Sequence, residues 1–140
     1  MKRILLAIDG GETSESIARF GFQIGQQMNA EIGMVSVVDT NFLITDGGLT
    51  ANEIAGITKD ELVAQQKKLS DKFFGQQKVW AFVQAGVPYE IILKVAKEWN
   101  ADLLVMGTHG RRGVAHLLLG SVAEKVLRHT TIPILVLPMP

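Results

Sequence analysis

Short, wholly apolar segments alternate along this chain with longer segments in which apolar residues recur every three or four positions. A short apolar run rich in β-branched residues predicts a buried strand, and the wider spacing predicts an amphipathic helix. Strands without polar alternation are typical of parallel sheets that helices cover on both faces. The sequence therefore predicts an α/β fold. Strands are expected at residues 2–9, 31–39, 79–85, 102–106 and 132–138, and helices at residues 13–29, from Thr50 or Thr58 to about Gly75, from Pro88 to Asn100, and at residues 122–129.

The bulk properties exclude several classes of function. The chain has 140 residues, which fits a single domain over residues 1–140, and its 14 basic residues balance 14 acidic ones. A net charge of zero argues against a nucleic-acid or membrane-surface binder. The absence of cysteine excludes disulfides and thiolate chemistry. The apolar start, Ile4 to Ile8, is too short for a signal peptide, and no stretch reaches the length of a membrane span, so we expect a cytoplasmic protein.

Unusual residues follow two of the expected strands. The first strand ends in Asp9-Gly10-Gly11, and the fourth ends in Gly107-Thr108-His109-Gly110. In open α/β sheets, ligands bind beyond the carboxyl ends of the strands, where the strand order reverses. Glycine has no Cβ, so backbone N–H groups in such turns approach a ligand closely and form an anion nest. These two turns are therefore the first candidates for a binding site.

The second turn leads toward the start of a helix. Ser121-x-x-Glu124 forms a capping-box pattern, which predicts Ser121 as the N-cap. The free N–H groups and positive dipole end of a helix N-terminus favour phosphate, and Arg111 and Arg112 add positive charge nearby. The stretch is not a Walker A loop, because no lysine follows the last glycine. Glycine-rich turns are common, however, so spacing alone leaves a phosphate site and a plain loop equally open.

The spacing Gly107-x2-Gly110-x9-Gly120-Ser121 resembles the nucleotide-binding pattern of the universal stress protein family, in its ATP-binding branch. ILLAIDGGETS resembles that family's first strand and turn, and the chain from GVPYE to the final strand resembles its C-terminal half. The middle, Asp39 to Gly75, is least distinctive. The resemblance implies a doubly wound, Rossmann-like sheet of five parallel strands in the order 3-2-1-4-5, with helices on both faces.

The resemblance also implies a site for ATP, ADP or AMP, with Mg²⁺ accompanying the nucleotide. Asp9 would hydrogen-bond the ribose hydroxyls, and the backbone near Val37 would contact adenine. His109 and Arg111 would flank the phosphates. The residues implied to hold the phosphates are Gly107, Gly110, Gly120, Ser121 and Val122. One departure is Gly11, where the family often has serine; the glycine pattern itself is intact, so we expect binding to be kept.

Two further segments bear on partners. The last strand, Ile132 to Pro138, is apolar on both faces and would lie at a sheet edge, which invites pairing with another chain. Because family members commonly dimerise through this strand, we expect a homodimer. The long connection from Asp39 to Thr50 is either a surface loop or, through its Phe42-Leu43-Ile44 cluster, a lid or a contact patch.

Three functions compete. The resemblance favours a nucleotide-dependent regulatory homodimer of the stress response, with adenine nucleotide as its ligand and no nucleic acid or membrane. The second is an enzyme that hydrolyses ATP or transfers its phosphoryl or adenylyl group; no Walker B acid is evident and His109 is the only candidate base, so at most slow hydrolysis is expected. The third is a chaperone-like interaction module without a ligand, against which the glycine spacing argues.

Overall fold

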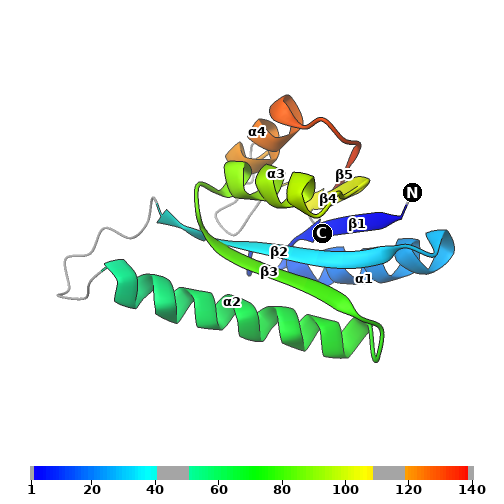
Figure 1. Cartoon of the computed structure of the whole chain (residues 1–140), viewed down its shortest axis with the longest axis horizontal. Helices are drawn as coiled ribbons and strands as arrows, with labels where there is room; N and C mark the ends of the chain where they lie inside the picture. Colours follow the sequence, from blue (N-terminus) through cyan, green and yellow to red (C-terminus); the bar gives the residue numbers. More distant parts are fainter. Residues whose placement is uncertain (1, 41–50, 109–118, 139–140) are drawn as a thin grey trace.

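The computed structural model describes residues 2–40, 51–108 and 119–138, with residues 51–58 described as backbone alone. Strands and helices alternate along the chain (Figure 1). This alternation confirms the α/β prediction, and most element boundaries lie within two residues of those expected. In chain order, the elements are β1 (Arg3–Ala7), α1 (Thr13–Met28), β2 (Glu31–Asp39), α2 (Ala51–Phe73), β3 (Val79–Gly86), α3 (Pro88–Glu98), β4 (Leu103–Gly107), α4 (Ser121–His129) and β5 (Ile134–Leu137).

The five strands form one parallel sheet in the order β3-β2-β1-β4-β5. This order confirms the one implied by the resemblance. The chain builds β1, β2 and β3 in one direction and then returns to the other side of β1 for β4 and β5. The strand order therefore reverses between β1 and β4, which is where open α/β sheets bind their ligands.

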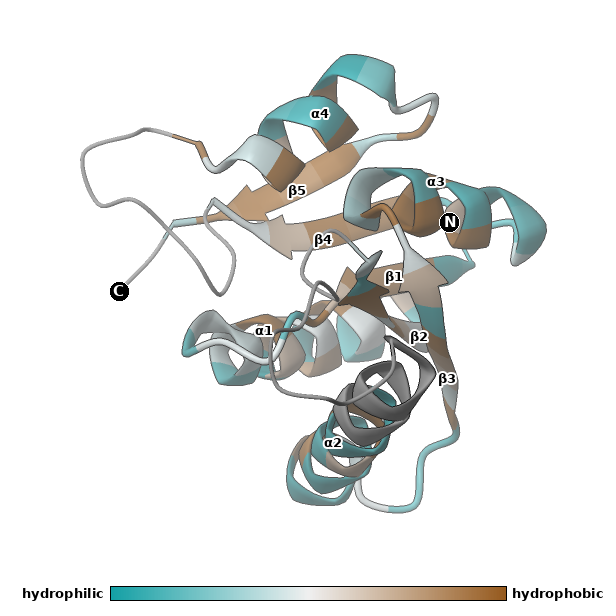
Figure 2. Ribbon diagram, turned by 90° about the vertical axis from the view of Figure 1, so that its left-hand side faces the viewer, coloured by the Kyte–Doolittle hydropathy of each residue, from teal (hydrophilic) through white to brown (hydrophobic). Residues whose placement is uncertain are grey.

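Two hydrophobic cores lie on opposite faces of the sheet, one under α1 and α2 and the other under α3 and α4 (Figure 1). Both are built from alternate residues of the same strands, because successive side chains of a strand point to opposite faces. Figure 2 shows hydrophobic residues concentrated in the strands and hydrophilic residues on the outer faces of the helices. Members of the first core include Ile4, Leu6, Ile17, Ile32, Leu69 and Val105, and members of the second include Leu5, Val35, Val95, Trp99, Leu104 and Val126.

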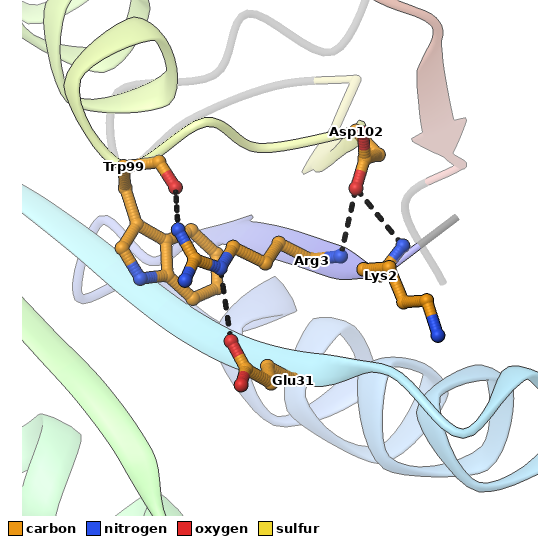
Figure 3. Close-up of polar contacts among 5 residues, drawn as sticks. All are labelled: Lys2, Arg3, Glu31, Trp99 and Asp102. Atoms are coloured by element: carbon orange, nitrogen blue, oxygen red, sulfur yellow. Dashed lines mark hydrogen bonds and ion pairs between the residues drawn. The ribbon is translucent and has the colours of Figure 1, made fainter.

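Hydrogen bonds and an ion pair link the amino ends of β1, β2 and β4 (Figure 3). The Asp102 carboxylate accepts hydrogen bonds from the backbone N–H groups of Lys2 and Arg3, at 2.9 and 3.0 Å. These two N–H groups hold the pKa of the Asp102 carboxyl below its usual value. The Arg3 guanidinium donates to Glu31 at 2.9 Å and to the backbone carbonyl of Trp99 at 2.7 Å. These hydrogen bonds connect the amino ends of β1, β2 and β4. The candidate site lies at the opposite, carboxyl ends of the strands.

Within the described residues, no helix is both long enough and apolar enough to cross a membrane.

Candidate functional site

The register of the sheet places three predicted site residues, Asp9, Val37 and Gly107, at nearly the same height along their strands. Ala7 of β1 pairs with Val35 of β2, and continuing this register by two residues brings Asp9 level with Val37. On the other side of β1, Leu6 pairs with Val105 of β4, and continuing this register by two residues brings Gly107 level with Ile8, the residue before Asp9. Asp9, Val37 and Gly107, implied for ribose, adenine and phosphate, therefore lie on or just after three adjacent strands, toward their carboxyl ends.

Asp9 is held by its own turn. One carboxylate oxygen, Oδ1, accepts the N–H of Gly11 at 2.8 Å. The other oxygen, Oδ2, is buried and has no hydrogen-bond partner within residues 2–40, 51–108 and 119–138. A buried carboxylate oxygen without a donor is costly, so a ligand hydroxyl would find an acceptor already desolvated. Gly10, between Asp9 and Gly11, has a backbone φ of 91°, which residues other than glycine rarely adopt.

A second unpartnered oxygen lies at the start of α1, beside the Asp9 turn. The N–H of Ser14 donates to the carbonyl of Gly11 at 3.1 Å, which places the start of α1 next to the Asp9 turn. The Ser14 side chain is 1% exposed, and its hydroxyl has no hydrogen-bond partner. The turn after β1 and the first turn of α1 therefore carry two buried oxygen atoms, on Asp9 and Ser14, that the described protein atoms leave unsatisfied.

The end of β4 and the start of α4 are tied together. The N–H of Gly120 donates to the carbonyl of Thr108 at 2.7 Å, and the N–H of Thr108 donates to the carbonyl of Leu137 at 2.9 Å. The first bond confirms that the helix N-terminus lies beside the turn after β4. It also engages the N–H of Gly120 within the protein, so this N–H group is already occupied.

The N-cap of α4 is Gly120, with φ −70° and ψ 165°, and Ser121 is the first helical residue. The predicted N-cap at Ser121 is therefore wrong by one position. The capping box does not form: Glu124 pairs instead with Arg128 one turn later, and no side chain caps the helix. A glycine in extended conformation serves as an N-cap without a side-chain oxygen. The first-turn N–H groups, including those of Ser121 and Val122, have no partner inside the helix and can bind an anion.

The remaining predicted site residues divide into two groups. Val37 is half-buried on β2, where its side chain packs on the second core, and Gly107 is buried at the end of β4, paired with Leu137. Both lie toward the carboxyl ends of their strands. His109, Gly110 and Arg111 lie outside the described residues, as do residues 41–50 of the long connection that begins at Asp39.

The structure also shows buried polar residues near the site that sequence reasoning missed. Ser36, in the middle of β2, is 1% exposed and donates its hydroxyl to the carbonyl of Ile8 at 2.6 Å. Gln66 of α2 is 3% exposed and contacts Ser36. A serine within an otherwise apolar strand is a signal that could have been noticed, because buried polar groups need partners. No pattern in the sequence of α2 distinguishes Gln66 from its glutamine neighbour.

Known structures share this architecture. The structure of MJ0577, a universal stress protein of Methanocaldococcus jannaschii, superposes with a TM-score of 0.83 at 25% identity, over 99% of this chain and 96% of that one. A universal stress protein in complex with cAMP gives a TM-score of 0.72 at 22% identity, covering 97% and 96%. The universal stress protein of Archaeoglobus fulgidus in complex with dAMP gives 0.64 at 20% identity, covering 97% of each chain. These matches show a shared fold.

The sequences of known proteins identify the family of this chain. The universal stress protein MJ0531 of Methanocaldococcus jannaschii is 32% identical over 146 residues, which cover 99% of this chain and 83% of that protein. The model of the universal stress protein family matches residues 1–138. A match over nearly the whole length, on a sheet with the strand order that the resemblance implied, places this chain in the universal stress protein family.

Proposed function

We propose that this chain is a single-domain universal stress protein of the ATP-binding branch, acting in the cytoplasm as a nucleotide-dependent regulator in a stress response. The observation that carries the proposal is the buried, unpartnered Oδ2 of Asp9 at the point where the strand order reverses. A ribose hydroxyl supplies the donor that this oxygen lacks. Two proteins of the same fold are solved with adenine nucleotides, cAMP and dAMP, which supports the choice of ligand class.

The residues at the carboxyl edge fit the parts of an adenine nucleotide. Asp9 would take the ribose hydroxyls, and the β2 backbone near Val37 would lie against adenine. The first-turn N–H groups of Ser121 and Val122 would donate to the phosphates, together with the Ser121 hydroxyl, which no capping bond occupies. Gly107 and Gly120 would leave room for the phosphates. Outside the described residues, Gly110 would complete the cradle, and His109 and Arg111 would flank it.

The triphosphate would bring Mg²⁺ with it. A magnesium ion on ATP is held mainly by phosphate oxygens and water, so it needs few protein ligands. In the part of the chain that the structure describes, no three His, Asp or Glu residues are grouped to bind a metal. The proposed metal would therefore enter as part of the nucleotide complex.

Thermal unfolding with a panel of nucleotides tests the ligand class. A ligand that binds only the folded state stabilises it by about 2.7 kcal/mol at 100 times its Kd. For a chain of 140 residues, this corresponds to a rise in Tm of roughly 8 °C. We expect ATP with Mg²⁺ to raise the Tm of nucleotide-free protein, with smaller shifts for ADP and AMP. Equal shifts with ATP and with inorganic triphosphate would contradict a site that recognises the nucleoside.

The proposed regulator is a homodimer that pairs through β5. This strand lies at the edge of the sheet, beyond β4, and its residues Ile134–Leu137 are apolar and half-buried (Figure 2). An apolar edge strand offers unpaired backbone groups and side chains to a second copy. The first and second cores include Ile134, Leu135 and Leu137 but not Val136, so Val136 is the β5 position whose replacement disturbs the described cores least.

Sedimentation of a Val136→Lys variant tests the dimer. A lysine on each copy at this edge would bring like charges into the interface, so we expect the variant to sediment as a monomer while the parent protein sediments as a dimer. Val63→Lys is the matched control, because Val63 is 48% exposed on α2, away from β5. A parent protein that is monomeric at all concentrations, or a Val136→Lys variant that stays dimeric, would exclude β5 as the interface.

A further inference from the structure

A buried polar chain crosses the first core from α2 to the residue before Asp9. The Ser36 hydroxyl, on β2, donates to the carbonyl of Ile8 at 2.6 Å. The amide nitrogen of Gln66 donates to the Ser36 oxygen at 2.8 Å and to the carbonyl of Phe82, on β3, at 3.1 Å. One side chain of α2 is therefore connected to β2 and β3 and, through Ser36, to the end of β1.

The partners of Gln66 determine how its amide group is oriented. The Ser36 hydroxyl already donates its proton to Ile8, so it offers Gln66 only lone pairs, and the Phe82 carbonyl is also an acceptor. The amide NH₂ must therefore face both groups. This leaves the amide oxygen of Gln66 buried without a partner, in a side chain that is 3% exposed. A leucine would fill this position without an unsatisfied atom, so packing alone does not account for the glutamine.

The Ser36 hydroxyl is bonded to the backbone at the point where the chain leaves β1. A hydroxyl rotates freely unless its neighbours fix it. With Gln66 donating to its oxygen, the Ser36 proton is directed to the carbonyl of Ile8. That carbonyl belongs to the peptide group between Ile8 and Asp9, so its orientation sets the direction of the Asp9 side chain. Ser36 also directly precedes Val37, the residue proposed to lie against adenine.

We infer that Gln66 is a positioning residue for Asp9: through Ser36 and the Ile8 carbonyl it fixes the carboxylate that would hold the ribose. This inference rests on the proposed function for its effect on nucleotide affinity, and on the protein contacts alone for its effect on the turn after β1. Helix α2 would thereby be coupled to the ribose end of the site, although Gln66 itself touches no nucleotide. The two effects can be measured separately.

The first experiment needs no nucleotide. The N–H of Gly11 donates to Asp9 Oδ1, so its hydrogen-exchange rate reports how firmly the carboxylate is held. Gln66→Met keeps the side-chain length and removes the amide. We expect Gln66→Met to raise the Gly11 exchange rate about fivefold or more, the size of effect typical of one lost hydrogen bond. Gln65→Met, on the neighbouring position of α2, is the matched control and should leave that rate unchanged. Equal Gly11 rates in the two variants would overturn the inference.

The second experiment compares ATP with 2′,3′-dideoxy-ATP, which lacks the hydroxyls that Asp9 would bind. Gln66→Met should weaken ATP binding about tenfold. It should leave dideoxy-ATP binding within about twofold, because that ligand makes no bond for Asp9 to lose. A variant that weakens both ligands equally would show general loosening of the fold and would contradict a positioning role.

Ser36→Ala provides a second route to the same test. Because Gln66 acts through Ser36, the double variant should weaken ATP binding no more than the more severe single variant. Additive losses would show that the two residues act independently and would overturn the proposed path. If the parent protein binds no nucleotide, the proposed function fails, and the Gly11 exchange rate alone still decides whether Gln66 positions Asp9.

Discussion

Replacing Asp9 with alanine is expected to weaken ATP binding about 100-fold. The carboxylate would accept hydrogen bonds from ribose hydroxyls through Oδ2, which is buried and has no partner among the residues that the structure describes. Hydrogen bonds to a charged group contribute about 1.5–3 kcal/mol each, and about 2.7 kcal/mol corresponds to 100-fold in Kd. Isothermal titration of both proteins with ATP and Mg²⁺ measures the difference.

Two controls make the Asp9 result interpretable. Asp71→Ala removes a carboxylate that pairs with Lys67 on the outer face of α2, so it changes the net charge equally and should leave the Kd unchanged. Dideoxy-ATP should bind Asp9→Ala and the parent protein with similar affinity, since it lacks the hydroxyls in question. A folded Asp9→Ala variant that binds ATP as tightly as the parent would show that Asp9 has no role in ribose binding.

The largest expected effect on stability is that of Trp99→Ala, a loss of about 3–5 kcal/mol in the free energy of unfolding. Trp99 is 8% exposed and lies against Trp80 and Phe82, with ring centroids 5.9 and 6.0 Å away. The Arg3 guanidinium covers the ring, 5.5 Å from its centroid (Figure 3). Removing the indole would leave a cavity at the amino edge of the second core. Denaturant unfolding measures the loss, with Leu127→Ala, at a 41% exposed position, as the control.

A substitution at Gly33 of β2 tests whether the Trp99 ring packs against this strand. A Cβ at Gly33 would lie 3.0 Å from the nearest ring atom of Trp99 and 3.4 Å from Leu5. Gly33→Ala should therefore destabilise the parent protein but not the Trp99→Ala variant, where the ring is gone and the methyl group enters the cavity. Such non-additivity is expected of residues in direct contact. If the two substitutions instead lower the free energy of unfolding by strictly additive amounts, the indole does not occupy the space beside Gly33.

The sequence predicted the elements well because each has a strong local signal. β2 begins and ends at the expected residues, 31 and 39, and α1 and α3 end within two residues of the predicted positions. Strands buried on both faces leave continuous apolar runs, and Pro88 marks the start of α3 in its first turn. The strand order itself came from the family resemblance, since local patterns carry no information on which strands are neighbours.

The differences arise where tertiary contacts override local patterns. Ser121 has the sequence signature of an N-cap, yet Gly120 takes that position, since its N–H bonds to Thr108 and its backbone is extended. The partnership of Gln66 with Ser36 joins residues 30 positions apart and depends on how α2 packs on the sheet. No periodicity within α2 could reveal it. The candidate site could be proposed from sequence because glycines and an aspartate stand at or just after the ends of strands, whereas the buried contacts of Ser36 and Gln66 beside it could not.

The most direct test of the account is a calorimetric titration of nucleotide-free protein with ATP and Mg²⁺, with Gly110→Val measured in parallel. A phosphate cradle formed around glycines has no room for a branched side chain, so we predict saturable binding of one nucleotide per chain in the parent and none in the variant. Absence of binding to the parent, or equal affinity of the two proteins, would contradict the claim that the carboxyl ends of β1 and β4 form a nucleotide site.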